Sequence, residues 1–148
     1  MTKQEFLAMS LPYKLFFRIE YGSTNQPTGI YQMSGVYETS VVEGFNYDNN
    51  VKTDKLKPIL HPLTDLTKEI EHNGEVFIPI DKLYHLDMLR CDISLFEFIN
   101  LDIVADHIYS NKFLEFTLIL AKWHFDIAKL IDKGEAIDVN TLDENPYK

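Results

Sequence analysis

Five histidines are the side chains of this 148-residue sequence with the clearest capacity for acid–base chemistry or metal binding. None has a second histidine four residues away, and no Cys-x-x-Cys pair accompanies them. Zinc sites usually show one of these spacings, because ligands on one turn converge on the ion. The pattern therefore does not predict a metal centre. The histidines are His61, His72, His85, His107 and His124.

Three of these histidines allow a more specific expectation. His124 could be a zinc ligand or a general base, but a packed histidine with one hydrogen bond is the favoured interpretation. His72 lies beside an Asn-Gly pair and is expected to be exposed. His107 follows Asp106, and adjacency in the sequence does not by itself make a catalytic dyad.

No other motif predicts catalysis. The glycines are isolated, so there is no phosphate-binding loop, and no Gly-x-Ser-x-Gly elbow occurs. Glu69, Glu71 and Glu75 are more typical of a solvated hairpin face than of paired catalytic carboxylates. Cys91 is the single cysteine, which excludes an internal disulfide and indicates a cytosolic protein. The sequence therefore predicts no catalytic residue, no metal and no cofactor.

The charge balance narrows the class of partner. Fourteen basic residues stand against 23 acidic ones, and the formal net charge is −9. Direct contact with nucleic acid is not expected, because phosphates require basic patches. Two interpretations remain open: the acids serve solubility alone, or they form a surface that docks on a basic groove of another protein. No apolar run is long enough to span a bilayer.

The stretch of residues 110–134 is expected to organise the fold. Phe113, Phe116, Leu120 and Trp123 recur at steps of three and four, and a second apolar row runs beside them. The resulting apolar arc is wider than that of an ordinary surface helix. Residues 111–133 are therefore predicted to form a long helix, covered on most sides and ended by Gly134.

Period-two patterns predict the sheet. Residues 30–47 indicate two short strands, and residues 68–78 indicate a hairpin with a type I′ turn at Asn73-Gly74. In this register Ile70 faces Phe77, and Glu71 faces Val76. Residues 57–63 are expected to be extended, and residues 136–139 to lie on the sheet edge or on the helix.

The remaining segments are expected to be helices and a loose end. Thr2 and Glu5 have the spacing of a capping box, and a second helix is predicted from Pro12 to Ile19. Residues 81–104 read as interrupted helices opened by Pro79, and residues 143–148 are expected to fray. Residues 1–148 thus form one compact α+β domain, with a small antiparallel sheet packed on a long C-terminal helix and accessory helices.

Three stretches of the sequence resemble a group of small, uncharacterised proteins from phages and prophages of Bacteroidetes bacteria. They are MTKQEFLAMSLPYKL, KPILHPLTDLTKEIEHNGEVFIPIDKL and WHFDIAKLIDKGEAIDVNTL. The resemblance does not extend to residues 16–55 and 84–122, and the group supplies no catalytic or binding residue to carry over. If one scaffold serves several roles, the role-specific surface is expected in the unmatched segments.

The leading hypothesis is a non-enzymatic phage accessory protein in the host cytoplasm. It would bind and inhibit a host protein, above all an RNA-guided defence nuclease, as an anti-CRISPR protein does. One alternative is a sponge that sequesters a nucleotide signal of host defence, against which the presence of only two arginines counts. The other alternative is a small enzyme. The residues predicted to bind the partner are Tyr31, Tyr37, Tyr47, Asp87, Asp92, Asp102 and Asp106.

Overall fold

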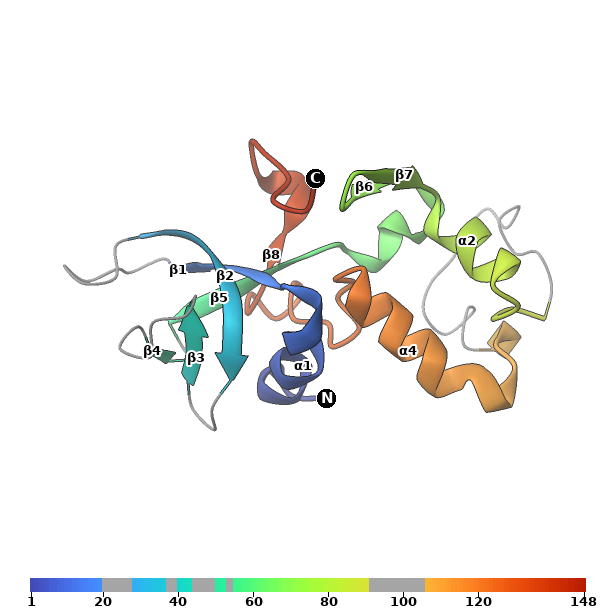
Figure 1. Ribbon diagram of the computed structural model, residues 1–148, viewed down its shortest axis with the longest axis horizontal. Coiled ribbons are helices and arrows are strands. Elements are labelled where there is room, and N and C mark those ends of the chain that lie inside the picture. The colour runs from blue at the N-terminus through green and yellow to red at the C-terminus, as the bar shows by residue number, and fades with distance from the viewer. Residues whose placement is uncertain (20–27, 37–39, 44–49, 53–54, 91–105) are drawn as a thin grey trace.

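The computed structural model of the chain places a sheet on one side and most of the helical segments on the other (Figure 1). It describes residues 1–19, 28–36, 40–43, 50–52, 55–90 and 106–148. The green strand β5 runs from the sheet towards the helices, and the C-terminal segment lies between the two sides (Figure 1). The description that follows refers to these residues only.

The main sheet has six strands in the order β4-β3-β2-β1-β5-β8. Neighbouring strands are antiparallel, except for the short parallel pair β5–β8. The hairpin β6–β7 forms a separate two-stranded sheet, whereas the sequence had predicted one small sheet containing both. The strands are β1 (Phe16–Ile19), β2 (Gly29–Val36), β3 (Ser40–Glu43), β4 (Asn50–Lys52), β5 (Leu56–Leu60), β6 (Ile70–His72), β7 (Glu75–Phe77) and β8 (Ile137–Asp138).

Strand β1 replaces the helix that was predicted from Pro12 to Ile19. A single 3₁₀ turn at Leu11–Tyr13 follows α1 (Lys3–Ser10), and Lys14 then adopts a left-handed conformation with φ 57°. The chain turns there into an extended segment in which Phe17 and Ile19 point to the core. The prediction was wrong because a short apolar run can be a helix face or a central strand, and pairing with β2 and β5 decided for the strand.

The hairpin prediction is confirmed residue by residue. Ile70 pairs with Phe77 and Glu71 with Val76. Asn73 and Gly74 have φ of 52° and 76°, the positive values that a type I′ turn requires. Side chains alternate along β6, so His72 lies on the same face as buried Ile70. His72 is itself buried, which corrects the expectation that it is exposed.

Local signals also fix where the first two helices begin. The Thr2 amide donates to the Glu5 carboxylate at 2.7 Å, and the Glu5 amide donates to Oγ1 of Thr2 at 3.2 Å, as a capping box requires. Pro79 opens helix α2 (Pro79–His85), as predicted. Most of the predicted helical stretch of residues 81–104 lies outside the described residues.

The prediction of one long C-terminal helix over residues 111–133 was wrong. Helix α4 (Phe113–Lys122) has ten residues and ends in a Schellman motif. The Phe125 amide donates to the Leu120 carbonyl at 2.9 Å, and the His124 amide donates to the Ala121 carbonyl at 3.0 Å. His124 occupies the left-handed position with φ 57°, where glycine is usual. The apolar arc looked too wide because only half of its residues belong to a helix.

After α4 the chain forms a series of tight turns. The Asp126 carboxylate accepts hydrogen bonds from the amides of Leu130 and Ile131, both at 2.8 Å. Lys129 and Gly134 have positive φ of 56° and 71°. Gly134 therefore has the predicted left-handed conformation, but it closes a turn instead of a helix.

Two apolar cores follow the two sides of the molecule. The first lies between α1, the sheet and the segment after residue 127, and includes Phe6, Phe17 and Leu60. The second lies between α2, α4 and the start of the hairpin, and includes Leu83 and Phe125. The α+β class is confirmed, whereas the arrangement around one long helix is not.

Candidate functional site

Three histidines that are far apart in the sequence meet around the penultimate residue of the chain. We call His61, His72, His124 and Tyr147 the histidine cluster. The His124 ring stacks on the Tyr147 ring at 4.2 Å between centroids and 15° between planes. His72 lies 5.1 Å from His124 and 5.6 Å from Tyr147, while His61 lies 6.1 Å from Tyr147. All four side chains are buried.

The C-terminal segment closes this cluster and joins the two sides of the molecule. The Tyr147 hydroxyl donates to the Ile59 carbonyl in β5 and accepts from the Phe16 amide in β1. The Asn73 amide in the hairpin turn donates to the Tyr147 carbonyl at 2.6 Å. Burial raises the pKa of Tyr147, so its hydroxyl stays protonated and able to donate. The expectation that residues 143–148 fray is therefore wrong.

None of the six ring nitrogens in the cluster makes a hydrogen bond of full geometry within the described part of the chain, although backbone carbonyls of Lys122 and Tyr13 lie near His72 and His124. A neutral imidazole has one N–H donor, and leaving it unsatisfied inside a protein costs about 1–3 kcal/mol. Burial, together with the neighbouring histidines, lowers the pKa of His72 to about 4 and that of His124 to about 3. These two rings are therefore neutral at pH 7.

A buried carboxylate supports the cluster from one side. Asp65 lies 3.7 Å from Nδ1 of His61. It accepts from Nζ of Lys68 at 2.8 Å and from Nδ2 of Asn140 at 2.6 Å. Burial alone would raise the pKa of Asp65, but His61, Lys68 and Asn140 outweigh it and hold the pKa at about 2. Asp65 is thus an ionised anchor for the loop after β5.

Neither metal binding nor a transmembrane role is indicated by the residues that the structure describes. Among them, no three His, Cys, Asp or Glu side chains are placed to hold a metal ion. Within the same residues, no helix is long and apolar enough to cross a bilayer. The ring contacts within the histidine cluster are those of a packed aromatic assembly.

A cleft of about 430 Å³ opens next to the cluster, between the hairpin, α2 and the end of α4. His72 lines it together with the aromatic rings of Phe77 and Trp123, whose centroids are 5.0 Å apart. Two lysines reach it from different helices: Lys82 of α2 lies 4.1 Å above the Phe77 ring, and Lys122 is the last residue of α4. The cleft thus combines cations, aromatic rings and a buried imidazole.

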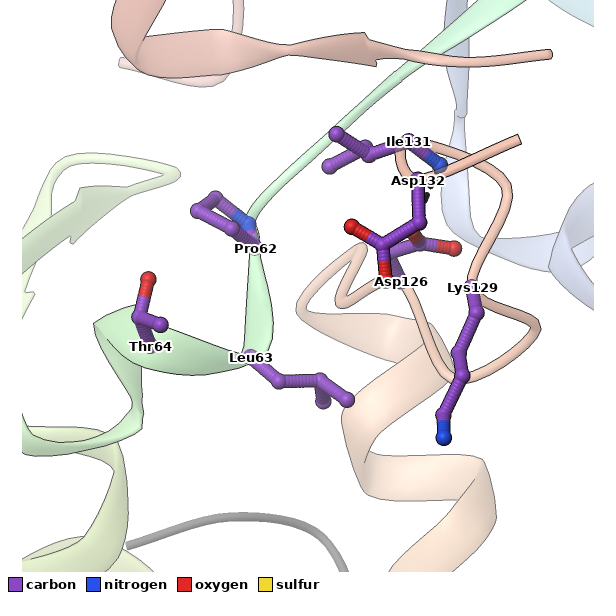
Figure 2. A pocket seen from close by; sticks show the side chains of 7 residues that line it. All are labelled: Pro62, Leu63, Thr64, Asp126, Lys129, Ile131 and Asp132. Carbon is purple, nitrogen blue, oxygen red and sulfur yellow. Dashed lines mark hydrogen bonds between the residues drawn. The ribbon is translucent and has the colours of Figure 1, made fainter. Parts of the chain in front are cut away.

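A second, smaller cavity of about 150 Å³ lies between the loop after β5 and the turns after α4 (Figure 2). Asp126 and Asp132 lie close together on its wall (Figure 2). Burial raises the pKa of Asp126, and the charge of Asp132 adds to this effect. Because the Asp126 carboxylate already accepts two backbone hydrogen bonds, we assign it to the fold.

Exposed apolar side chains gather on the helical side of the molecule. Among the described residues, six of the nine large exposed apolar side chains come from the end of α2 and from residues 109–118. An isolated bridge between Leu89 and Ile108 and the hydrogen bond from the Tyr109 amide to the Met88 carbonyl hold these two segments together. We call this set the helical face: Tyr84, Leu86, Tyr109, Phe113, Leu114 and Leu118.

The structure places three of the seven predicted partner-binding residues. Tyr31 is half-buried in β2 and packs on Phe17, with ring centroids 6.1 Å apart, so it contributes to the sheet core. Asp87 and Asp106 are exposed and lie on the two segments joined by the Leu89–Ile108 bridge. Tyr37, Tyr47, Asp92 and Asp102 lie outside the described residues.

Asp87 also has a structural role that the sequence did not predict. Its φ is 53°, and it occupies the left-handed position of a Schellman motif at the end of α2. The Met88 amide donates to the Leu83 carbonyl at 3.1 Å, and the Asp87 amide donates to the Tyr84 carbonyl at 3.0 Å. Aspartate tolerates this conformation better than most residues.

Sequence reasoning missed the histidine cluster. One signal was present: His72 alternates with Ile70 in the predicted strand, so it belongs to the buried face. No local pattern links His61 and His124 to Tyr147, because these contacts span most of the chain.

Comparison with known proteins found no matching family model, no matching curated protein and no matching solved structure.

Proposed function

We propose that this protein is a non-enzymatic binding protein that docks on another protein through its helical face. The observation that supports the proposal is the concentration of exposed apolar side chains there. Leu114 is 71% exposed and Phe113 57% exposed, at the start of a helix whose other end is buried. Exposed apolar patches commonly mark sites of protein–protein contact.

Acidic side chains accompany this face and favour a basic partner. Asp87 and Asp106 flank the bridge between its two segments, whereas Glu115 on α4 is already paired with Lys112. The chain as a whole carries a net charge of −9. Acids around an apolar centre steer the approach of a basic surface, while the buried apolar contacts provide most of the affinity.

A nuclease is the class of partner that best fits this combination, because its nucleic-acid channel is basic. Together with the resemblance to phage proteins, this supports an inhibitor that acts in the host cytoplasm on an RNA-guided defence nuclease. The partner-binding roles of Tyr37, Tyr47, Asp92 and Asp102 stay predictions, because these residues lie outside the described part of the chain.

The experiment compares matched apolar substitutions in a binding assay with purified nucleases of the host. Leu114→Ser and Phe113→Ser should each weaken binding about tenfold or more, as expected for anchors at the centre of an interface. Val76→Ser is the control, because Val76 is equally exposed at 57% but lies on the hairpin. Thermal unfolding should show that all three variants remain folded.

Two further substitutions remove the negative charges of Asp87 and Asp106 and test their contribution separately. Asp87→Asn keeps a residue that accepts the left-handed conformation, and Asp106→Asn is its counterpart on the other segment. Both should slow association at low ionic strength and lose this effect at high salt, because screening shortens the Debye length. Unchanged binding in Leu114→Ser and Phe113→Ser, or an equal loss in Val76→Ser, would refute docking through the helical face.

A further inference from the structure

The cleft beside the histidine cluster has the composition of a ligand site, and docking through the helical face does not require it. Lys82 and Lys122 reach it from two different helices. Both charges lie close to the His72 ring, because each of them lowers its pKa. Burial and His61 lower that pKa more. The site is thus locally positive in a protein whose net charge is −9.

One acid opposes these two lysines. Glu75 forms a salt bridge with Lys82 across the cleft, and its side chain is 61% exposed. The two lysines and this glutamate together leave one positive charge. Carbonyls at the end of α4 would repel an anion, but the Schellman motif already engages those of Leu120 and Ala121.

His72 provides an independent reason to expect a polar ligand. It lines the cleft and is buried, and neither of its ring nitrogens makes a hydrogen bond of full geometry within the described part of the chain, although the Lys122 carbonyl lies near enough to raise its pKa. A neutral imidazole needs an acceptor for its single N–H. An oxygen atom of a ligand would satisfy this donor, and the lysines would neutralise the charge of the ligand.

Apolar side chains in the lining suit a flat ring. Leu86 and Ile119 line the cleft, whereas Lys82 already covers the Phe77 ring at 4.1 Å. A flat ring packed on Leu86 and Ile119 would bury apolar surface. A volume of about 430 Å³ is within the range of small-molecule sites.

We propose that this cleft binds a small organic phosphate that carries a flat ring. The phosphate lies between Lys82 and Lys122, His72 donates to one of its oxygens, and the ring packs against Leu86 and Ile119. A mononucleotide has this chemistry, so AMP is a suitable probe, with inorganic phosphate and adenosine representing its two halves.

Trp123 makes the test direct, because it is the only tryptophan of the chain and it lines the cleft. Tryptophan fluorescence therefore reports on this site alone. AMP should change the emission in a saturable manner, and its affinity should exceed that of adenosine or of inorganic phosphate by about tenfold. The histidine signals in NMR should show a raised pKa for His72 in the complex, because a bound anion favours its charged form.

Three variants separate a built site from adventitious binding. Lys122→Ala should weaken AMP binding about tenfold, whereas Lys112→Ala, just before the other end of α4, should leave it unchanged. Glu75→Gln should strengthen binding severalfold, because it releases Lys82 from its carboxylate partner.

Several results would overturn the proposal. These are the lack of a saturable response to AMP at millimolar concentration, equal losses in Lys122→Ala and Lys112→Ala, or weaker binding in Glu75→Gln. A further refuting result is AMP binding no tighter than inorganic phosphate, which would mean an adventitious ion only. Leu114→Ser should bind AMP normally, so failure of this proposal is distinguishable from failure of docking through the helical face.

Discussion

The two halves of α4 present similar apolar side chains to opposite surroundings. At the start of α4, Phe113 and Leu114 are exposed, whereas Phe116 is already buried in the second core. In the second half, Leu120 and Ala121 are completely buried, and the chain continues into the histidine cluster. The sequence pattern is continuous across both halves, so it cannot explain this difference. What differs is the packing: Leu120 lies in the second core with side chains of α2 and the hairpin, whereas Phe113 and Leu114 do not.

This comparison separates residues that hold the fold together from residues that are available to a partner. Side chains at the buried end contact elements from β1 to the C-terminus, and their loss is expected to affect stability. Side chains at the exposed end contact little, and their loss is expected to affect binding.

Tyr147→Ala should have the largest effect. The change removes a buried ring and leaves the Ile59 carbonyl and the Phe16 amide without their partner. We expect the free energy of unfolding to fall by about 3–5 kcal/mol in chemical denaturation. Tyr109→Ala is the matched control on the helical face and should cost under about 1 kcal/mol. A loss below about 1 kcal/mol for Tyr147→Ala would show that the C-terminal segment does not close the structure.

Substitutions within α4 compare its two halves directly. Leu120→Ala should lower the free energy of unfolding by about 2–5 kcal/mol, because it opens a cavity in the second core. Leu114→Ala makes the same chemical change at an exposed position and should cost no more than about 0.5 kcal/mol. Similar losses for both, measured by urea denaturation, would contradict the division of α4 into a buried and an exposed half.

Acid should destabilise the buried region through its histidines. The pKa of His72 and of His124 is lowered in the folded protein, so the unfolded chain takes up protons first as the pH falls below about 6.5. We expect a loss of about 1–3 kcal/mol between pH 6.5 and 5, after allowance for partial solvation. The stabilisation from Asp65 is lost only as the pH falls from 3.8 towards about 2, so it does not contribute in this interval.

The titration is assigned with two phenylalanine substitutions. His72→Phe should flatten the dependence of the melting temperature on pH in that interval, because one group with a lowered pKa is removed. His85→Phe changes an exposed histidine of α2, and its melting temperature should depend on pH as that of the parent protein does. An unchanged profile in His72→Phe would mean that folding does not lower the pKa of this ring.

The smallest effect concerns the turns after α4. Lys129 is exposed and has φ of 56°, a conformation that costs a residue with a side chain about 1 kcal/mol or more. Lys129→Gly should therefore raise the free energy of unfolding by up to about 1 kcal/mol. Lys122→Gly makes the same change at the last residue of α4, where the backbone is helical, and should lower the free energy of unfolding by about 1 kcal/mol. Thermal unfolding should show that only Lys129→Gly is more stable than the parent protein. If both variants are more stable, or neither is, the assignment of the helix end is contradicted.

Several features of the fold were predictable from the sequence because the interactions that fix them are local. The capping box links Thr2 to Glu5, and the turn depends on the adjacent pair Asn73-Gly74. Pro79 begins a helix, and Gly134 takes the left-handed conformation. In each case the interacting groups lie within a few residues of one another, so the sequence contains the whole interaction.

The tertiary structure alone decided the strand β1, the end of α4 and the histidine cluster. The Tyr147 hydroxyl bonds to groups 88 and 131 residues away, and these contacts decide which rings are buried. The His124 carbonyl accepts from the His61 amide, and this pairing favours a strained left-handed histidine over another turn of helix. Periodicity records which residues are apolar, but burial depends on which distant segment covers them.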